Sequence, residues 1–65
     1  MSKLKYRRTA AGLTQKQLAE AAGISIRLLQ EYEQGRKDLN RAQVQKALAL
    51  ANALGVRVEE ILPEE

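Results

Sequence analysis

The chain has 65 residues, a formal net charge of +3, and neither cysteine nor histidine. That length suits one domain, over residues 1–65, whose core is too small to enclose a cofactor or a small-molecule substrate. Without cysteine or histidine, thiolate chemistry and the commonest general base and metal ligand are excluded, so we expect no enzyme, no cofactor and no metal. No apolar run approaches the roughly 20 residues that span a bilayer, and no signal peptide is evident. These features predict a soluble, cytoplasmic protein with no membrane partner.

The charge is unevenly distributed along the chain. Residues 1–41 hold nine Lys or Arg against four Asp or Glu, a net of +5, whereas residues 42–65 hold two against four, a net of −2. A basic portion of this kind indicates a face for a polyanion such as DNA. A solvated surface that is merely uneven explains the same pattern equally well.

Apolar residues recur at helical spacing along the whole chain, and the glycines fall after the periodic runs. Thr14 with Gln17 fits a capping box, as does Asn40 with Gln43, and Ser25 fits an N-cap. We therefore expect an all-α fold with helices near residues 3–11, 15–22, 26–34, 41–54 and 58–62, followed by a short acidic tail at 63–65.

The most informative segment covers residues 15–34. Gly23 permits the positive φ that reverses the chain, and Ala19 is small enough for two helices to cross closely. Leu18, Ala22 and Ile24 supply apolar surface on one side, and Leu29 and Tyr32 supply it on the other. We interpret Leu29 and Tyr32 as core. Two short, steeply crossed helices are the geometry of a helix-turn-helix.

These residues resemble the Cro/repressor-type (xenobiotic-response-element-like) helix-turn-helix family of phage and bacterial transcriptional regulators. The resemblance is strongest in GLTQKQLAEAAGIS (12–25) and ALGVRVEEIL (53–62), and it extends along nearly the whole chain. It implies a compact five-helix bundle of the lambda-repressor-like type and double-stranded DNA as the partner. In this family the second helix crosses the DNA backbone and the third enters the major groove.

Carried over residue by residue, the resemblance implies two sets of DNA contacts. Base edges would be read by the start of the third helix, through Ser25, Ile26, Arg27, Gln30 and Glu31. Arg27 suits guanine, Gln30 suits adenine and Ile26 suits a thymine methyl group. Glu31 leaves two interpretations open, a contact with cytosine or an exposed pair with Arg27. Phosphates would be contacted by Thr14, Gln15, Lys16, Gln34, Arg36, Lys37, Asn40 and Arg41.

The chain departs from the family pattern at three places. Arg7 replaces a commonly apolar residue, and a DNA contact by Arg7 or Arg8 stays open. Arg57 stands where a Ser or Asp would usually cap the last helix, which predicts fraying there. The stretch between Gly35 and Gly55 is longer than in short phage repressors.

The number of phosphate contacts also predicts how DNA binding depends on salt. If five to seven of these cations meet phosphates, the logarithm of the affinity for DNA falls with the logarithm of the salt concentration with a slope of roughly −4.5 to −6.

Alternatives to a natural DNA-binding regulator also stay open. An antitoxin-like or regulator-subunit role would use the third helix to dock a protein, with weak DNA binding. The composition, with ten alanines and strong helix formers, also fits an engineered DNA binder on this scaffold. We expect a monomer or weak homodimer that pairs on DNA, and any dimer would use the last helix or helix four through Val58, Ile61 and Leu62.

Overall fold

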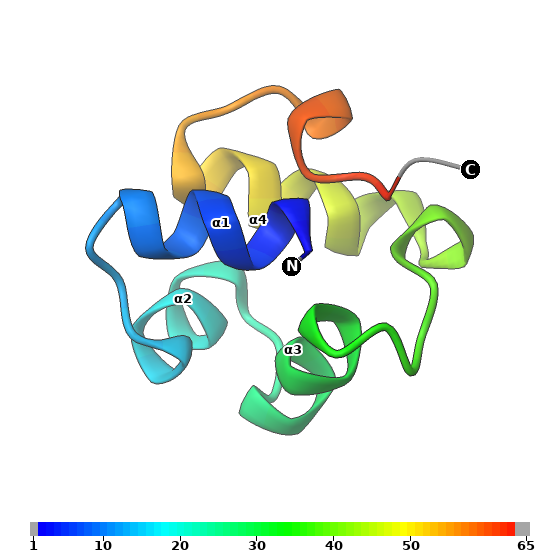
Figure 1. Cartoon of the computed structure of the whole chain (residues 1–65), viewed down its shortest axis with the longest axis horizontal. Coiled ribbons are helices and arrows are strands. Elements are labelled where there is room, and N and C mark those ends of the chain that lie inside the picture. Colours follow the sequence, from blue (N-terminus) through cyan, green and yellow to red (C-terminus); the bar gives the residue numbers. More distant parts are fainter. Residues whose placement is uncertain (1, 64–65) are drawn as a thin grey trace.

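The computed structural model describes residues 2–63, and within them every regular element is helical (Figure 1). The four α-helices are α1 (Lys3–Ala10), α2 (Gln15–Ala22), α3 (Ile26–Glu33) and α4 (Val44–Leu54). Two three-residue 3-10 turns, η1 (Leu39–Arg41) and η2 (Val58–Glu60), follow α3 and α4. The all-α prediction is confirmed. Residues 64 and 65 of the predicted acidic tail lie outside the described residues.

The first three helices each begin at a hydroxyl side chain that satisfies a free backbone N–H. Ser2, Thr14 and Ser25 accept hydrogen bonds from the backbone nitrogens three residues later, at 2.9, 3.0 and 3.0 Å. At Thr14 the box is reciprocal, because the Gln17 side chain accepts from the Thr14 N–H at 2.9 Å. The predicted caps at Thr14 and Ser25 are therefore confirmed.

Thr14→Ala is expected to lower the free energy of unfolding by about 1 kcal/mol, because it leaves an N–H at the start of α2 without its cap. Thr9→Ala is the matched control. The Thr9 hydroxyl donates to the Lys5 and Tyr6 carbonyls inside α1, a bond that contributes little, and alanine is the better helix former there. Urea unfolding followed by circular dichroism measures both, and equal losses in the two variants would contradict the capping role.

The turn between α2 and α3 depends on Gly23. This residue ends α2 in the left-handed region, with φ +71°, and its N–H donates back to the Glu20 carbonyl. The next N–H, that of Ile24, donates to the Ala19 carbonyl at 3.0 Å, so two free carbonyls at the helix end are satisfied. The reversal places the Ser25 cap at once, and only three residues separate the end of α2 from the start of α3.

The core lies where α2 packs on α4, with α3 and α1 closing it. Leu18, Leu29 and Leu50 are completely buried, one from each of α2, α3 and α4. Ala19, on α2, and Ala47, on α4, are also buried, and their small side chains let these helices approach. The predicted core positions Leu29 and Tyr32 are confirmed. The other buried apolar residues are Leu4, Leu39, Ala51 and Ile61.

The predicted start of the fourth helix is wrong. The helix begins at Val44 rather than near residue 41, and Gln43 precedes it without a side-chain cap. Asp38 takes the capping role upstream, accepting from the Asn40 N–H at 2.9 Å and opening η1 instead. That 3-10 turn buries Leu39, and it commits Asn40 to a bond with the Pro63 carbonyl at 3.1 Å. A capping box between Asn40 and Gln43 is therefore absent.

The predicted fifth helix is also wrong, because the described residues contain four α-helices and only the short turn η2 near the C-terminus. Arg57 offers no side-chain acceptor for the free N–H groups there. Instead the Glu60 carboxylate reaches back to the Arg57 N–H at 2.7 Å, and this bond holds the pKa of Glu60 below its usual value. The chain then turns inward to bury Ile61, and Pro63 cannot donate to a continuing helix.

None of the helices in residues 2–63 is both long and apolar enough to cross a membrane.

Candidate nucleic-acid interface

The outward face of α3 is the centre of the candidate site. α3 lies at one edge of the molecule, between α2 and the loop that leads to η1, and on the side away from η2 (Figure 1). Ser25, Ile26 and Arg27 are exposed, whereas Leu29 and Tyr32 face the core. Helical periodicity separates the two rows, so the residues predicted to read bases begin on the free side of the helix.

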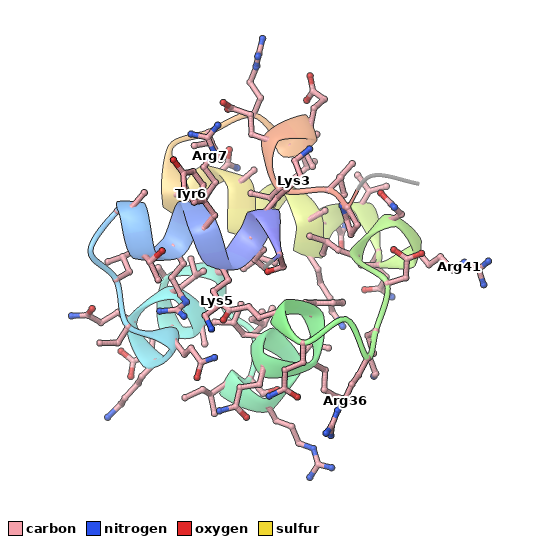
Figure 2. The ribbon with its side chains drawn as sticks, viewed as in Figure 1. Lys3, Lys5, Tyr6, Arg7, Arg36 and Arg41 are labelled. Atoms are coloured by element: carbon pink, nitrogen blue, oxygen red, sulfur yellow. The ribbon has the colours of Figure 1, made fainter. Side chains whose placement is uncertain are left out.

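A polar hollow continues this face toward the following loop. It is lined by side chains predicted to meet bases or phosphates, namely Arg27, Gln30, Glu31, Gln34 and Arg36. The loop returns to α3 because the Arg36 and Lys37 N–H groups both donate to the Glu31 carbonyl, at 2.9 and 3.3 Å. Arg36 therefore lies beside the end of α3 and extends away from the protein (Figure 2).

Glu31 makes no ion pair with Arg27 within the described residues. The exposed Arg–Glu pair that the sequence left open is therefore not formed in the structure. The Glu31 side chain is half-buried beside Tyr32. The pKa of the Tyr32 hydroxyl is raised by the burial of this hydroxyl and by the negative charge of Glu31. Arg27 stays free to reach a partner outside the chain.

A hydrogen-bonded chain of polar side chains joins α3 to the start of α2. The Gln30 amide donates to the Gln15 side-chain oxygen at 3.3 Å, and the Gln15 amide donates to Glu33 at 3.1 Å. Glu33 in turn accepts two bonds from Arg8, at 2.6 and 3.1 Å. The structure thus brings together Gln15 and Gln30, which were assigned separately to a phosphate and to a base. The buried ion pair of Arg8 and Glu33 holds Gln15, and Gln15 in turn holds Gln30.

That ion pair was missed at the level of sequence, where Arg8 was left as an open DNA contact. The Arg8 and Glu33 side chains are only 10% and 2% exposed, and Arg8 also donates to the Leu13 carbonyl at 2.9 Å. Helical spacing carried the signal, because Arg8 lies four residues after buried Leu4 and Glu33 lies four residues after buried Leu29. Both charges are therefore on core-facing rows.

Arg7 lies on the part of α1 that contacts the C-terminal turn, far from α3. It donates to Glu60 at 3.1 Å, and its guanidinium lies 5.8 Å from the centre of the Tyr6 ring. The Arg7 and Tyr6 side chains project from α1 on the side opposite α2 and α3 (Figure 2). The structure thus places neither Arg7 nor Arg8 with the candidate site.

The residues predicted to contact phosphates flank α3 on two sides. Thr14, Gln15 and Lys16 lie at the start of α2, and of these Lys16 is exposed without an ion pair among the described residues. Beyond α3, Arg36 and Lys37 are exposed in the loop. Arg41, 89% exposed, makes only a long contact of 4.0 Å with Asp38, and Figure 2 shows it extending outward. The exposed polar residues Gln34 and Asn40 complete this set.

Comparison with known protein families identifies the family of this chain. A sequence model of the helix-turn-helix family matches residues 4–61, which is most of the chain. The chain therefore belongs to the lambda-repressor-like helix-turn-helix family, a DNA-binding family that typically regulates transcription and is generally non-enzymatic. Searches of curated proteins and of solved structures returned no match. The narrower Cro/repressor type stays a prediction.

Proposed function

We propose that this protein binds double-stranded DNA sequence-specifically, by placing α3 in the major groove, and regulates transcription. The observation that carries the proposal is the division of α3 into two rows. One row is buried in the core, and the other presents Ser25, Ile26 and Arg27 to solvent, with exposed Lys16 on one side and the exposed cations of the following loop on the other. A helix about 10–12 Å across fits a major groove of about 12 Å.

Each outward side chain has chemistry that suits a base edge. Arg27 carries a fork of donors that matches the O6 and N7 acceptors of guanine, and exposed Ile26 suits the methyl group of thymine. Glu31 would accept a hydrogen bond from cytosine, and Ser25 could donate to or accept from a neighbouring base. No residue of this set is committed to the core of the protein.

Gln30 is the residue whose orientation is best defined. Its amide gives one N–H to Gln15, which leaves the second N–H and the carbonyl oxygen unused. That remaining pair is what adenine needs, because its N7 accepts and its N6 amino group donates. Gln15 and the buried pair behind it would therefore fix Gln30 before DNA arrives, which reduces the entropy lost on binding.

The flanking residues would follow the phosphate backbone without reading sequence. On one side these are Thr14, Gln15 and Lys16, with the backbone N–H groups at the start of α2. On the other side they are Gln34, Arg36, Lys37, Asn40 and Arg41. Contacts from both sides would fix how α3 lies in the groove.

Selection of bound duplexes from a random library tests this function. Arg27→Ala and Gln30→Ala are each expected to relax the preference at one or two base positions, by about 1–3 kcal/mol of discrimination. Lys37→Ala is the matched control, since losing a phosphate contact should weaken all sequences about equally. An Arg27→Ala protein that selects the same sequences as the wild type would show that α3 does not read bases in this way.

A further inference from the structure

The side chain of Gln30 is held by the protein itself, unlike the exposed side chain of Arg27. The Gln30 amide is half-buried, and its nitrogen donates to the Gln15 side-chain oxygen at 3.3 Å. The Gln15 nitrogen donates to Glu33 at 3.1 Å, and Arg8 donates twice to the same buried carboxylate, at 2.6 and 3.1 Å. A chemical change on the base that Gln30 reads therefore meets a side chain that is already fixed.

The buried carboxylate also determines which way round the two amides lie. An ionised carboxylate accepts hydrogen bonds and donates none, so the Gln15 nitrogen must face Glu33. The Gln15 oxygen then faces Gln30, and an oxygen requires the nitrogen of the Gln30 amide as its partner. Turning the Gln30 amide over would place two oxygens against each other. The carbonyl oxygen and the second N–H of Gln30 are consequently the groups left for a base.

Adenine offers these two groups the N7 acceptor and one hydrogen of its N6 amino group. The other N6 hydrogen is used in the pair with thymine, so only the hydrogen on the major-groove side is free. A methyl group on N6 takes the place of that free hydrogen whenever the base pair is kept. The Gln30 oxygen then loses its donor, and the methyl group lies between the Gln30 N–H and N7. Both hydrogen bonds are lost together.

A freely rotating glutamine would turn away from such a methyl group and bind water instead. Gln30 can turn away only by breaking its bond to Gln15, which would leave the half-buried Gln15 oxygen without its partner. Leaving desolvated polar groups unpaired costs more than the net contribution of the bonds that they made. The hydrogen-bonded chain from Arg8 to Gln30 therefore makes the methyl group unfavourable, and the loss exceeds that of one contact.

We infer that this protein distinguishes adenine from N6-methyladenine in its DNA site and is released by the methylated base, an inference that rests on the proposed function. Gln30 reads the unmodified amino group, and Gln15 is the positioning residue that prevents Gln30 from adapting. The contact assigned to Arg27 does not respond to this modification, because guanine presents O6 and N7. A DNA methyltransferase that acts on N6 of this adenine therefore switches the site from bound to free.

Duplexes with N6-methyladenine at one position at a time test the inference. Each adenine of the selected site, on either strand, is replaced in turn, and fluorescence anisotropy gives the dissociation constants. Wild-type protein is expected to bind about 100-fold more weakly when one particular adenine is methylated. That adenine is the position at which Gln30→Ala relaxes the sequence preference. Methylation of the other adenines should change the affinity by less than about threefold.

Variants separate the residue that reads the base from the residue that positions it. Gln30→Ala should bind the methylated and unmodified duplexes within about threefold of each other, and Gln15→Ala should reduce the ratio to about tenfold. Neither substitution removes the buried pair of Arg8 and Glu33. Lys37→Ala is the matched control, because loss of a phosphate contact should weaken binding to both duplexes and keep the ratio at about 100-fold. An unchanged ratio in Gln15→Ala would refute the positioning role.

The negative results have different meanings. Sequence-specific binding that no methylated adenine weakens by more than about threefold would overturn this inference and leave the proposed function in place. A methylation effect of full size in Gln30→Ala would also overturn it, because the effect would then come from the duplex itself. Binding without any sequence preference on unmodified duplexes would reject the base-reading function, and this inference with it.

Discussion

Arg8→Met is expected to lower the free energy of unfolding by about 3–5 kcal/mol. The substitution keeps most of the aliphatic volume but leaves Glu33, whose side chain is 2% exposed, without its cationic partner. A domain of this length has a total stability of roughly 3–10 kcal/mol, so this loss is a large part of the total. Urea unfolding followed by circular dichroism measures the loss directly.

Two variants separate the effect of burial from the effect of charge. Arg7→Met removes the neighbouring arginine, whose pair with Glu60 is 38% and 27% exposed, and should cost about 1 kcal/mol or less. Arg8→Met/Glu33→Leu removes both buried charges and should regain much of the loss, because no charge is then left uncompensated. An Arg8→Met protein as stable as Arg7→Met would contradict the structural role given to this pair.

The affinity for duplex DNA is expected to fall roughly 150-fold between 50 and 200 mM salt. Each phosphate neutralised contributes a slope of about −0.9 in log affinity against log salt. Apart from Arg27, which is assigned to a base, the residues predicted to contact phosphates include four exposed cations, Lys16, Arg36, Lys37 and Arg41, and Arg7 and Arg8 are held in ion pairs. The expected slope is therefore about −3.6, shallower than the one predicted from sequence.

Single substitutions test that assignment of charges. Lys37→Ala should make the slope about 0.9 shallower, whereas Arg7→Met should leave it unchanged. Fluorescence anisotropy at a series of salt concentrations gives both values. A weak affinity with almost no salt dependence would favour the alternative in which α3 docks a protein partner.

The helices with local start and stop signals could be predicted from sequence. Thr14 and Ser25 cap their helices through bonds that span three residues, and Gly23 supplies a backbone conformation set by the residue itself. Where two residues could each cap a helix, the local sequence pattern did not show which of them does. Asp38 and Asn40 both suit the start of a helix, and burial of Leu39 favours the short turn that begins at Asp38.

The outward residues of α3 could likewise be predicted, because helical periodicity alone separates them from Leu29 and Tyr32. The hydrogen bonds that hold Gln30 in place could not be predicted from helix propensity or periodicity. The contact between Gln15 and Gln30 joins side chains from two helices, and it depends on Arg8 arriving from a third. The sequence left a DNA contact by Arg8 open, although the position of Arg8 four residues after buried Leu4 indicated the core.

The most direct measurement is the structure of the protein bound to a selected duplex. We expect the side chains of Ile26, Arg27 and Gln30 to contact base edges in the major groove, with the Gln15–Gln30 hydrogen bond retained. A complex in which the duplex lies against another face of the protein, with Arg27 and Gln30 pointing to solvent, would contradict the function proposed for α3.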